Sequence, residues 1–173
     1  MLTSKERFET EEYAVYSSLI ESWFVSDNTR LIVIEDQSGL GLSSSLQEIL
    51  ESLTESFPTP TKEILADFKT KNRQASPLKS LFSLTVPYVL INNQEMDDIF
   101  QIERDGWDEF YRRYPNSQGM MALSRVGFNP DMNQALVYVG NQSHWRAGTG
   151  HLVLLIKEDG TWKIQGKTMV WIS

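Results

Sequence analysis

One stretch decides the fold: His151-Leu152-Val153-Leu154-Leu155-Ile156-Lys157-Glu158-Asp159-Gly160-Thr161. Apolar side chains occupy both alternating sets of positions before Lys157, which is typical of a strand that is buried on both faces. The Asp-Gly pair is a strong signal for a tight hairpin turn, and a second strand-like run, 162–172, follows it. The sequence therefore predicts a central strand with an antiparallel neighbour and with helices covering one side.

Two further strand-like runs precede this hairpin, at 121–128 and 134–141. Asn129-Pro130-Asp131 lies between them and consists of residues that favour turns. We therefore expect the last fifty or so residues to form an antiparallel sheet of four or more strands.

The N-terminal part of the chain is dominated by helical periodicity. Apolar residues recur at spacings of three and four through 4–26, and Thr3 with Glu6 has the spacing of a capping box. Further helices are predicted at 44–54, after a Thr59 cap with Pro60 at the first helical position, and after caps at Asn92 and Asp105. Two shorter runs, 30–35 and 84–91, read as strands, and Pro87 favours an edge position or a bulge for the second.

These elements indicate a single α+β domain over residues 1–173, with N-terminal helices packed on the C-terminal antiparallel sheet. The cone-shaped fold of the nuclear-transport-factor-like proteins, in which helices line the concave side of a curved sheet, is one architecture that suits this order. That suggestion is an analogy at the level of the fold and carries no function with it.

Composition excludes several classes of function. The 173 residues include no cysteine, which removes disulfides, thiolate catalysis and thiolate metal sites. A formal net charge of −7 argues against nucleic-acid binding, which needs a basic face. The N-terminus shows no signal-peptide pattern and no apolar run approaches the ~20 residues that span a bilayer. We expect a soluble, cytoplasmic protein that binds neither nucleic acid nor membrane.

Residues 117–173 resemble a family of uncharacterised bacterial proteins, many of them cyanobacterial. The resemblance rests on Ser-Arg-Val-Gly-Phe-Asn at 124–129, on Gln-Ala-Leu-Val-Tyr-Val-Gly-Asn-Gln at 134–142, on Gly-Thr-Gly at 148–150 and on the closing Trp-Ile-Ser at 171–173. The stretch 105–115 is similar to the middle of the same family. Some relatives carry cysteines where this chain has residues 143–146, so no cysteine chemistry is transferred. The resemblance implies no activity.

The most unusual segment is Ser143-His144-Trp145-Arg146-Ala147-Gly148-Thr149-Gly150. Loops on rigid scaffolds often carry binding residues, and Trp and Arg dominate interface hot spots. The alternative is a plain hairpin loop in which the two glycines permit the turn. His151, at the start of a strand, is either a general base or a histidine bonded at a sheet end.

Arg125 completes the candidate binding residues, which are Arg125, His144, Trp145, Arg146 and His151. Its guanidinium could fork onto a carboxylate or phosphate ligand, or it could pair with an acidic side chain for structural reasons. Two histidines without a ligand-spacing motif predict no metal site. No cofactor motif is present, so we expect no cofactor.

Three functions remain open. The first is a non-catalytic binding or accessory protein that contacts a protein partner through the 143–150 loop and a sheet face, and it predicts an exposed Trp145. The second is a small-molecule binder or enzyme with a pocket between helices and sheet, where His151 or Arg125 lies beside a carboxylate. The third is a structural or assembly protein that dimerises through an open apolar face of its sheet.

Overall fold

The computed structural model describes residues 1–40, 45–51, 53, 58–101 and 106–173. In this part of the chain the helices are α1 (Ser4–Trp23), α2 (Leu46–Glu51), α3 (Lys62–Lys71), α4 (Asn93–Phe100) and α5 (Gly106–Arg113). The strands are β1 (Leu31–Glu35), β2 (Tyr88–Ile91), β3 (Ser117–Leu123), β4 (Gly127–Phe128), β5 (Gln134–His144), β6 (Ala147–Glu158) and β7 (Thr161–Ile172).

All the described strands join one mixed sheet in the order β2-β1-β3-β5-β6-β7, with β4 paired to β5. The pairs from β3 through β7 are antiparallel, whereas β1 is parallel to both β2 and β3. The α+β prediction is confirmed, and the expected antiparallel sheet is extended at one end by two parallel pairs. Strand β2 forms one edge of the sheet, which is one of the two positions that Pro87 favoured, and it begins only after that proline. The nuclear-transport-factor-like cone stays a prediction.

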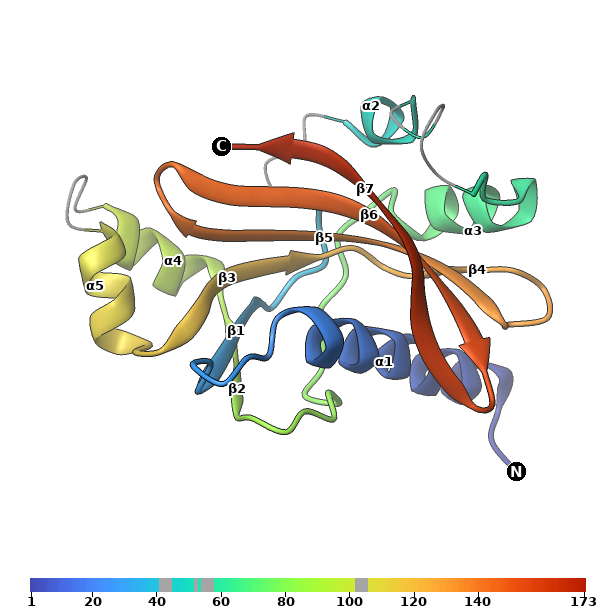
Figure 1. The fold of residues 1–173 in the computed structure, drawn as a ribbon, viewed down its shortest axis with the longest axis horizontal. Helices are drawn as coiled ribbons and strands as arrows, with labels where there is room; N and C mark the ends of the chain where they lie inside the picture. Colours follow the sequence, from blue (N-terminus) through green and yellow to red (C-terminus); the bar gives the residue numbers. More distant parts are fainter. Residues whose placement is uncertain (41–44, 52, 54–57, 102–105) are drawn as a thin grey trace.

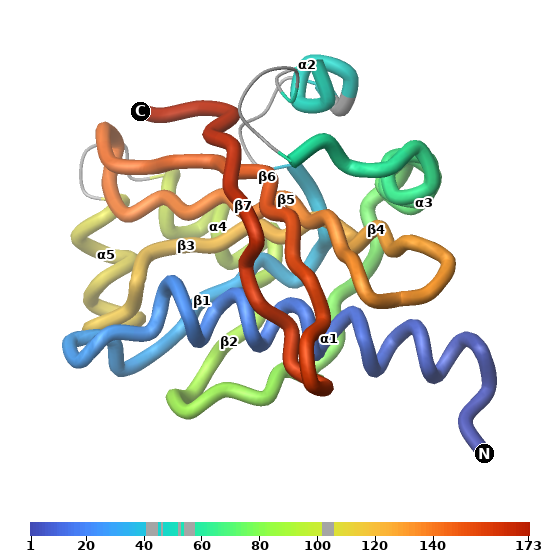
Figure 2. The backbone as a smooth tube through the Cα atoms, turned by 45° about the vertical axis from the view of Figure 1, so that its right-hand side comes forward, coloured from blue at the N-terminus to red at the C-terminus, as the bar shows by residue number. Residues whose placement is uncertain are grey.

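Helix α1 packs against one face of the sheet (Figures 1 and 2). The predicted capping box is present, because the Thr3 N–H donates to Glu6 at 2.7 Å and the Glu6 N–H donates to the Thr3 hydroxyl at 3.2 Å. The helix ends at Trp23, three residues before its expected end. Its apolar stripe shares a core with Val153 and Leu155 of β6.

The opposite face is covered by two separate groups of helices. Leu152 and Leu154 of β6 pack there, so the prediction that this strand is buried on both faces is confirmed. Helices cover both faces and not only one side. Helices α2 and α3 lie over β5 and β6, and α4 and α5 lie over β1 and β2, toward the other end of the sheet (Figure 1). The first core contains Ile49, Leu53, Ile64, Phe68, Leu136, Tyr138, Leu152 and Leu154, and the second contains Val33, Ile91, Ile99, Trp107, Phe110 and Tyr114.

The helix caps confirm one prediction and correct another. Asn92 caps α4, since its side-chain oxygen accepts the Glu95 N–H at 2.8 Å. Helix α3 is capped by Thr61, whose hydroxyl accepts the Ile64 N–H at 3.3 Å, and not by Thr59. Two threonines alternate with prolines here, and the local pattern does not distinguish them. The predicted cap Asp105 and the first residue of the helix predicted at 44–54 lie outside the described residues.

The turns of the sheet follow the sequence closely. Asp159 and Gly160 both adopt positive φ, 50° and 78°, as the Asp-Gly hairpin requires. The 121–128 run was predicted as one strand but forms two, β3 and β4, which both pair with β5. Residues 124–126 lie between them and belong to neither strand. Arg125 instead bonds through its backbone N–H to Asn72, and the Val126 N–H bonds to Glu12.

Candidate functional site

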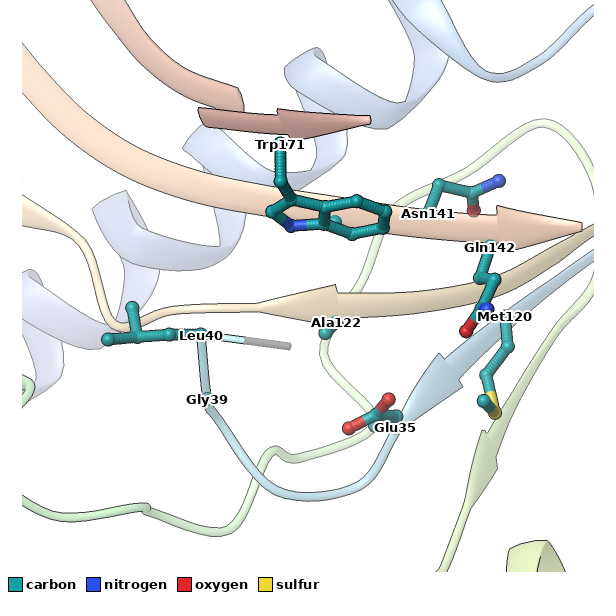
Figure 3. A pocket seen from close by; sticks show the side chains of 9 residues that line it. Glu35, Gly39, Leu40, Met120, Ala122, Asn141, Gln142 and Trp171 are labelled. Carbon is teal, nitrogen blue, oxygen red and sulfur yellow. The ribbon is translucent and has the colours of Figure 1, made fainter. Parts of the chain in front are cut away.

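A cleft of about 270 Å³ lies on the sheet face between the two groups of helices. It is lined by Glu35, Gly39, Leu40, Met120, Ala122, Gly140, Asn141, Gln142 and Trp171. These residues come from β1, β3, β5, β7 and the segment that follows β1. In Figure 3 the carboxyl of Glu35 and the indole of Trp171 lie on opposite sides of the cleft, with Ala122 between them.

Glu35 is the last residue of β1, where this strand runs parallel to its neighbours on both sides. Ligands in sheets with parallel strands commonly bind beyond the carboxyl ends of those strands. The carboxyl of Glu35 makes no hydrogen bond or ion pair within the part of the chain that the structure describes. Burial raises its pKa to about 7, and the negative charge of Asp36 acts in the same direction. Both protonation states are therefore populated near neutral pH.

The indole of Trp171 forms the opposite wall and lies against two glycines of β6. A Cβ added to Gly150 would be 2.0 Å from the indole Nε1, and one added to Gly148 would be 3.1 Å from the ring. The Nε1–H donates to the Tyr138 hydroxyl at 2.7 Å. The two glycines lie within a strand and lack positive φ, so the interpretation of them as turn glycines was wrong. They allow a large aromatic ring to lie on the backbone.

Strands β1, β3 and β5, which line the cleft, are joined by side chains that bond to backbone. The Gln118 amide accepts from the Val33 N–H at 3.0 Å and donates to the Val33 carbonyl at 2.8 Å, which bridges β1 to β3 where the strand register shifts. The Asn141 side-chain NH₂ donates to the Gln118 carbonyl at 3.0 Å. The Asn141 Oδ1 is buried and has no hydrogen-bond partner. This oxygen is closed off from solvent, so a molecule in the cleft does not reach it.

The cleft combines one carboxyl, one aromatic face and the amide side chain of Gln142. Among the lining residues described, Glu35 is the single titratable group, so the cleft offers no second carboxyl, histidine or lysine with which it could form a catalytic pair. In the described residues no three histidine or carboxylate side chains gather as a metal site would require. This arrangement is suited to recognising a polar group beside a flat apolar surface.

Arg125 lies outside this cleft and pairs with an acidic side chain. Its Nε donates to both carboxylate oxygens of Glu12 at 3.0 and 2.9 Å, and Glu12 also accepts the Val126 N–H. Asn72 bonds to the backbone N–H and carbonyl of Arg125. The contacts are those of a structural clamp between α1, α3 and the β3–β4 connection, which is the second of the two roles weighed from the sequence.

His151 lies inside β6 and faces α1, on the side of the sheet opposite to Trp171. Its ring packs edge-on against Trp23 at 4.8 Å between centroids. Burial lowers the pKa of His151, and the positive charge of Lys167 adds to the effect. No carboxylate is bonded to it among the described side chains, so the orienting acid that a general base needs is not seen there.

The segment 143–150 is mostly strand and not loop. His144 pairs with Ala147, which leaves Trp145 and Arg146 as the turn between β5 and β6. Trp145 is 46% exposed, and its ring contacts Trp107 at 6.5 Å between centroids. The His144 ring also stacks on Trp107 at 6.4 Å. His144, Trp145 and Arg146 are thus together at one hairpin, away from both Arg125 and His151.

Sequence reasoning missed Glu35, Gln142 and Trp171 as site residues. A carboxylate directly after a buried β-branched run was a usable signal for Glu35, since charged residues seldom end such a strand inside a core. Gln142 and Trp171 lie in segments that the resemblance already marked. No local pattern shows that these three residues meet.

Comparisons with protein families, with curated proteins and with solved structures found no match to this chain. Within the described residues, the helices are too short or too polar for any of them to traverse a lipid bilayer.

Proposed function

We propose that this protein binds a compact small molecule in the cleft between Glu35 and Trp171. The observation that carries the proposal is the carboxyl of Glu35, which faces the cavity without a partner in the described part of the chain. Single buried charges are costly unless they are paired. Titratable groups that lie in a cleft and whose pKa is strongly shifted by burial are often found at functional sites.

The construction of the opposite wall supports the same conclusion. Trp171 reaches its position because Gly148 and Gly150 leave room for the ring and Tyr138 accepts its N–H. Pockets for small molecules are typically apolar and aromatic surfaces with a few placed polar groups. The cleft has this composition, and its volume places it at the small end of such sites.

Fragment binding followed by NMR tests the proposal. A library of compact fragments should shift the backbone amides of Gly39 and Gly140 and the indole N–H of Trp171. Ala122→Leu projects extra carbon atoms from the strand between the two walls, so it should weaken fragment binding at least about tenfold, equal to roughly 1.4 kcal/mol. Near-ultraviolet circular dichroism checks that the variant keeps its packing.

Ala147→Leu provides the matched control, because Ala147 is exposed at the β5–β6 hairpin and outside the cleft. It should bind fragments as the unmodified protein does. The proposal is wrong if fragments shift no cleft resonance, or if the folded Ala122→Leu protein binds them with undiminished affinity.

Docking of a protein partner through the 143–150 hairpin is the second candidate. Its support is the 46% exposed Trp145 at the hairpin turn, since tryptophan anchors many interfaces. A photo-reactive residue at position 146 should give one defined adduct in source cells, and Trp145→Ala should abolish it. Adducts that persist in the Trp145→Ala protein would contradict this candidate.

Dimerisation through the sheet has less support. The described helices cover both faces of the sheet. The exposed apolar side chains that could take part in a sheet-to-sheet contact are Met169 and Ile172, on the edge strand β7. Analytical ultracentrifugation distinguishes this role, which requires a dimer at moderate concentration.

A further inference from the structure

We infer, on the basis of the proposed binding cleft, that its ligand is a compact organic monocation with a flat apolar part. The ammonium or amidinium group would pair with Glu35, and the flat part would lie against Trp171 (Figure 3).

The charges around the cleft point to a cation. Glu35 is the one charged side chain among the described lining residues, and neither lysine, arginine nor histidine is part of that lining. Asp36 is the other charged group that acts on Glu35. The segment after β1 and the strands β3, β5 and β7 contribute apolar or uncharged side chains to the cleft. The chain as a whole carries −7, which draws cations toward its surface.

The uncharged groups of the cleft also favour a cation. The face of an indole attracts positive charge through its ring quadrupole. Gln142 contributes an amide side chain, whose oxygen accepts hydrogen bonds. A ligand that carries N–H donors and positive charge satisfies Glu35 and the Gln142 oxygen together, whereas an anion would be repelled by Glu35.

The protonation of Glu35 gives this inference a definite sign. A cation binds to the ionised carboxyl, so its affinity must fall as pH drops below the pKa of about 7. A neutral ligand that accepts a hydrogen bond prefers the protonated carboxyl, and its affinity must rise over the same range. The pH dependence therefore identifies the charge class of the ligand.

Three probes of nearly the same shape test the inference: benzamidine, benzamide and benzoate. Isothermal titration at pH values of about 8 and about 5.5, with NMR to locate each probe, should rank benzamidine first. Benzamidine keeps its charge across this range, so its affinity should be about 30-fold weaker at the lower pH. Glu35→Gln should weaken the binding of benzamidine at least about tenfold at the higher pH and should remove the pH dependence of this affinity.

Glu158→Gln is the control, because it changes the net charge by the same amount at an exposed position by the β6–β7 turn. It should leave the affinity for benzamidine within about twofold, since exposed charges are screened. Benzamidine binding in the cleft that is unaffected by Glu35→Gln would overturn the inference.

The outcomes separate this inference from the proposed function. If benzamide, benzoate or the uncharged fragments of the library occupy the cleft and benzamidine binds no better than they do, the monocation is wrong and the binding site stands. If neither the probes nor the fragment library reaches the cleft, both the inference and the proposed function are wrong.

Discussion

Replacing Glu35 with glutamine should raise the stability of the folded protein at alkaline pH and leave it nearly unchanged in acid. Glutamine has almost the shape of a protonated glutamic acid and carries no charge to desolvate. The substitution therefore removes only the ionisation of Glu35. No described side chain in the cleft neutralises the negative charge that this ionisation produces.

The size of the effect follows from the pKa of Glu35. Burial and Asp36 raise it from its usual 4.5 to about 7 in the folded state. Between these two pH values, Glu35 is therefore still protonated in the folded protein and already ionised in the unfolded chain. Each pH unit in this interval costs about 1.4 kcal/mol, so ionisation of Glu35 lowers the free energy of unfolding by about 3 kcal/mol in total. This is an upper value, because the side chain retains some contact with solvent.

Urea unfolding between about pH 4.5 and about pH 8.5 measures this difference directly. The free energies of unfolding of Glu35→Gln and of the unmodified protein should differ by close to zero at the acid end. The difference should grow through the interval and level off above about pH 7. The exposed Glu158→Gln control should show no such growth.

Two results would contradict a raised pKa of Glu35 in the folded protein: a stability gain of Glu35→Gln that is the same at every pH, or one that falls as pH rises. The first result would mean that the carboxyl titrates normally in the folded state. The second would mean that the ionised carboxyl is stabilised by a cationic partner, and no such partner is present among the described side chains.

Three other substitutions test individual contacts within the fold. Gln118→Ala removes both bonds to a buried peptide of β1 and should cost about 2–3 kcal/mol in urea unfolding; a cost under about 0.5 kcal/mol would contradict the bridge. Glu12→Ala leaves Arg125 without its acid and should cost about 2–4 kcal/mol, less than a fully buried pair because the arginine is partly exposed; full stability would show the clamp to be dispensable. Gly150→Ala drives a methyl group into the ring of Trp171 and should displace it, which tryptophan fluorescence and the loss of fragment binding would report; an unchanged spectrum would contradict the packing.

Local chemistry predicted much of the fold. The Asp-Gly turn, the Asn92 cap and the doubly buried strand β6 each depend on residues close together in the sequence. The parallel placement of β1 depends on a long-range pairing with β3, which is bridged by the Gln118 amide. Nothing in the run 30–35 specifies its partner strand.

The candidate site was harder to predict, because its residues are brought together by that same pairing. Glu35 reaches the cleft only once β1 lies beside β3, and Trp171 reaches it only once β7 folds back on β6. Gly148 and Gly150 held a readable signal, since glycine inside a strand often marks the close approach of another group. The unusual side chains at 144–146 drew attention to the hairpin turn beside these glycines, away from the strand surface on which the indole lies.

The most direct test is an NMR titration of the Glu35 side-chain carboxyl, with and without saturating benzamidine. The midpoint should lie near pH 7 in the free protein and clearly lower in the complex, because the bound cation favours the ionised form. A midpoint close to 4.5 in the free protein would show that burial does not hold the proton on Glu35, and a midpoint that saturating benzamidine leaves unmoved would show that Glu35 does not pair with the cation.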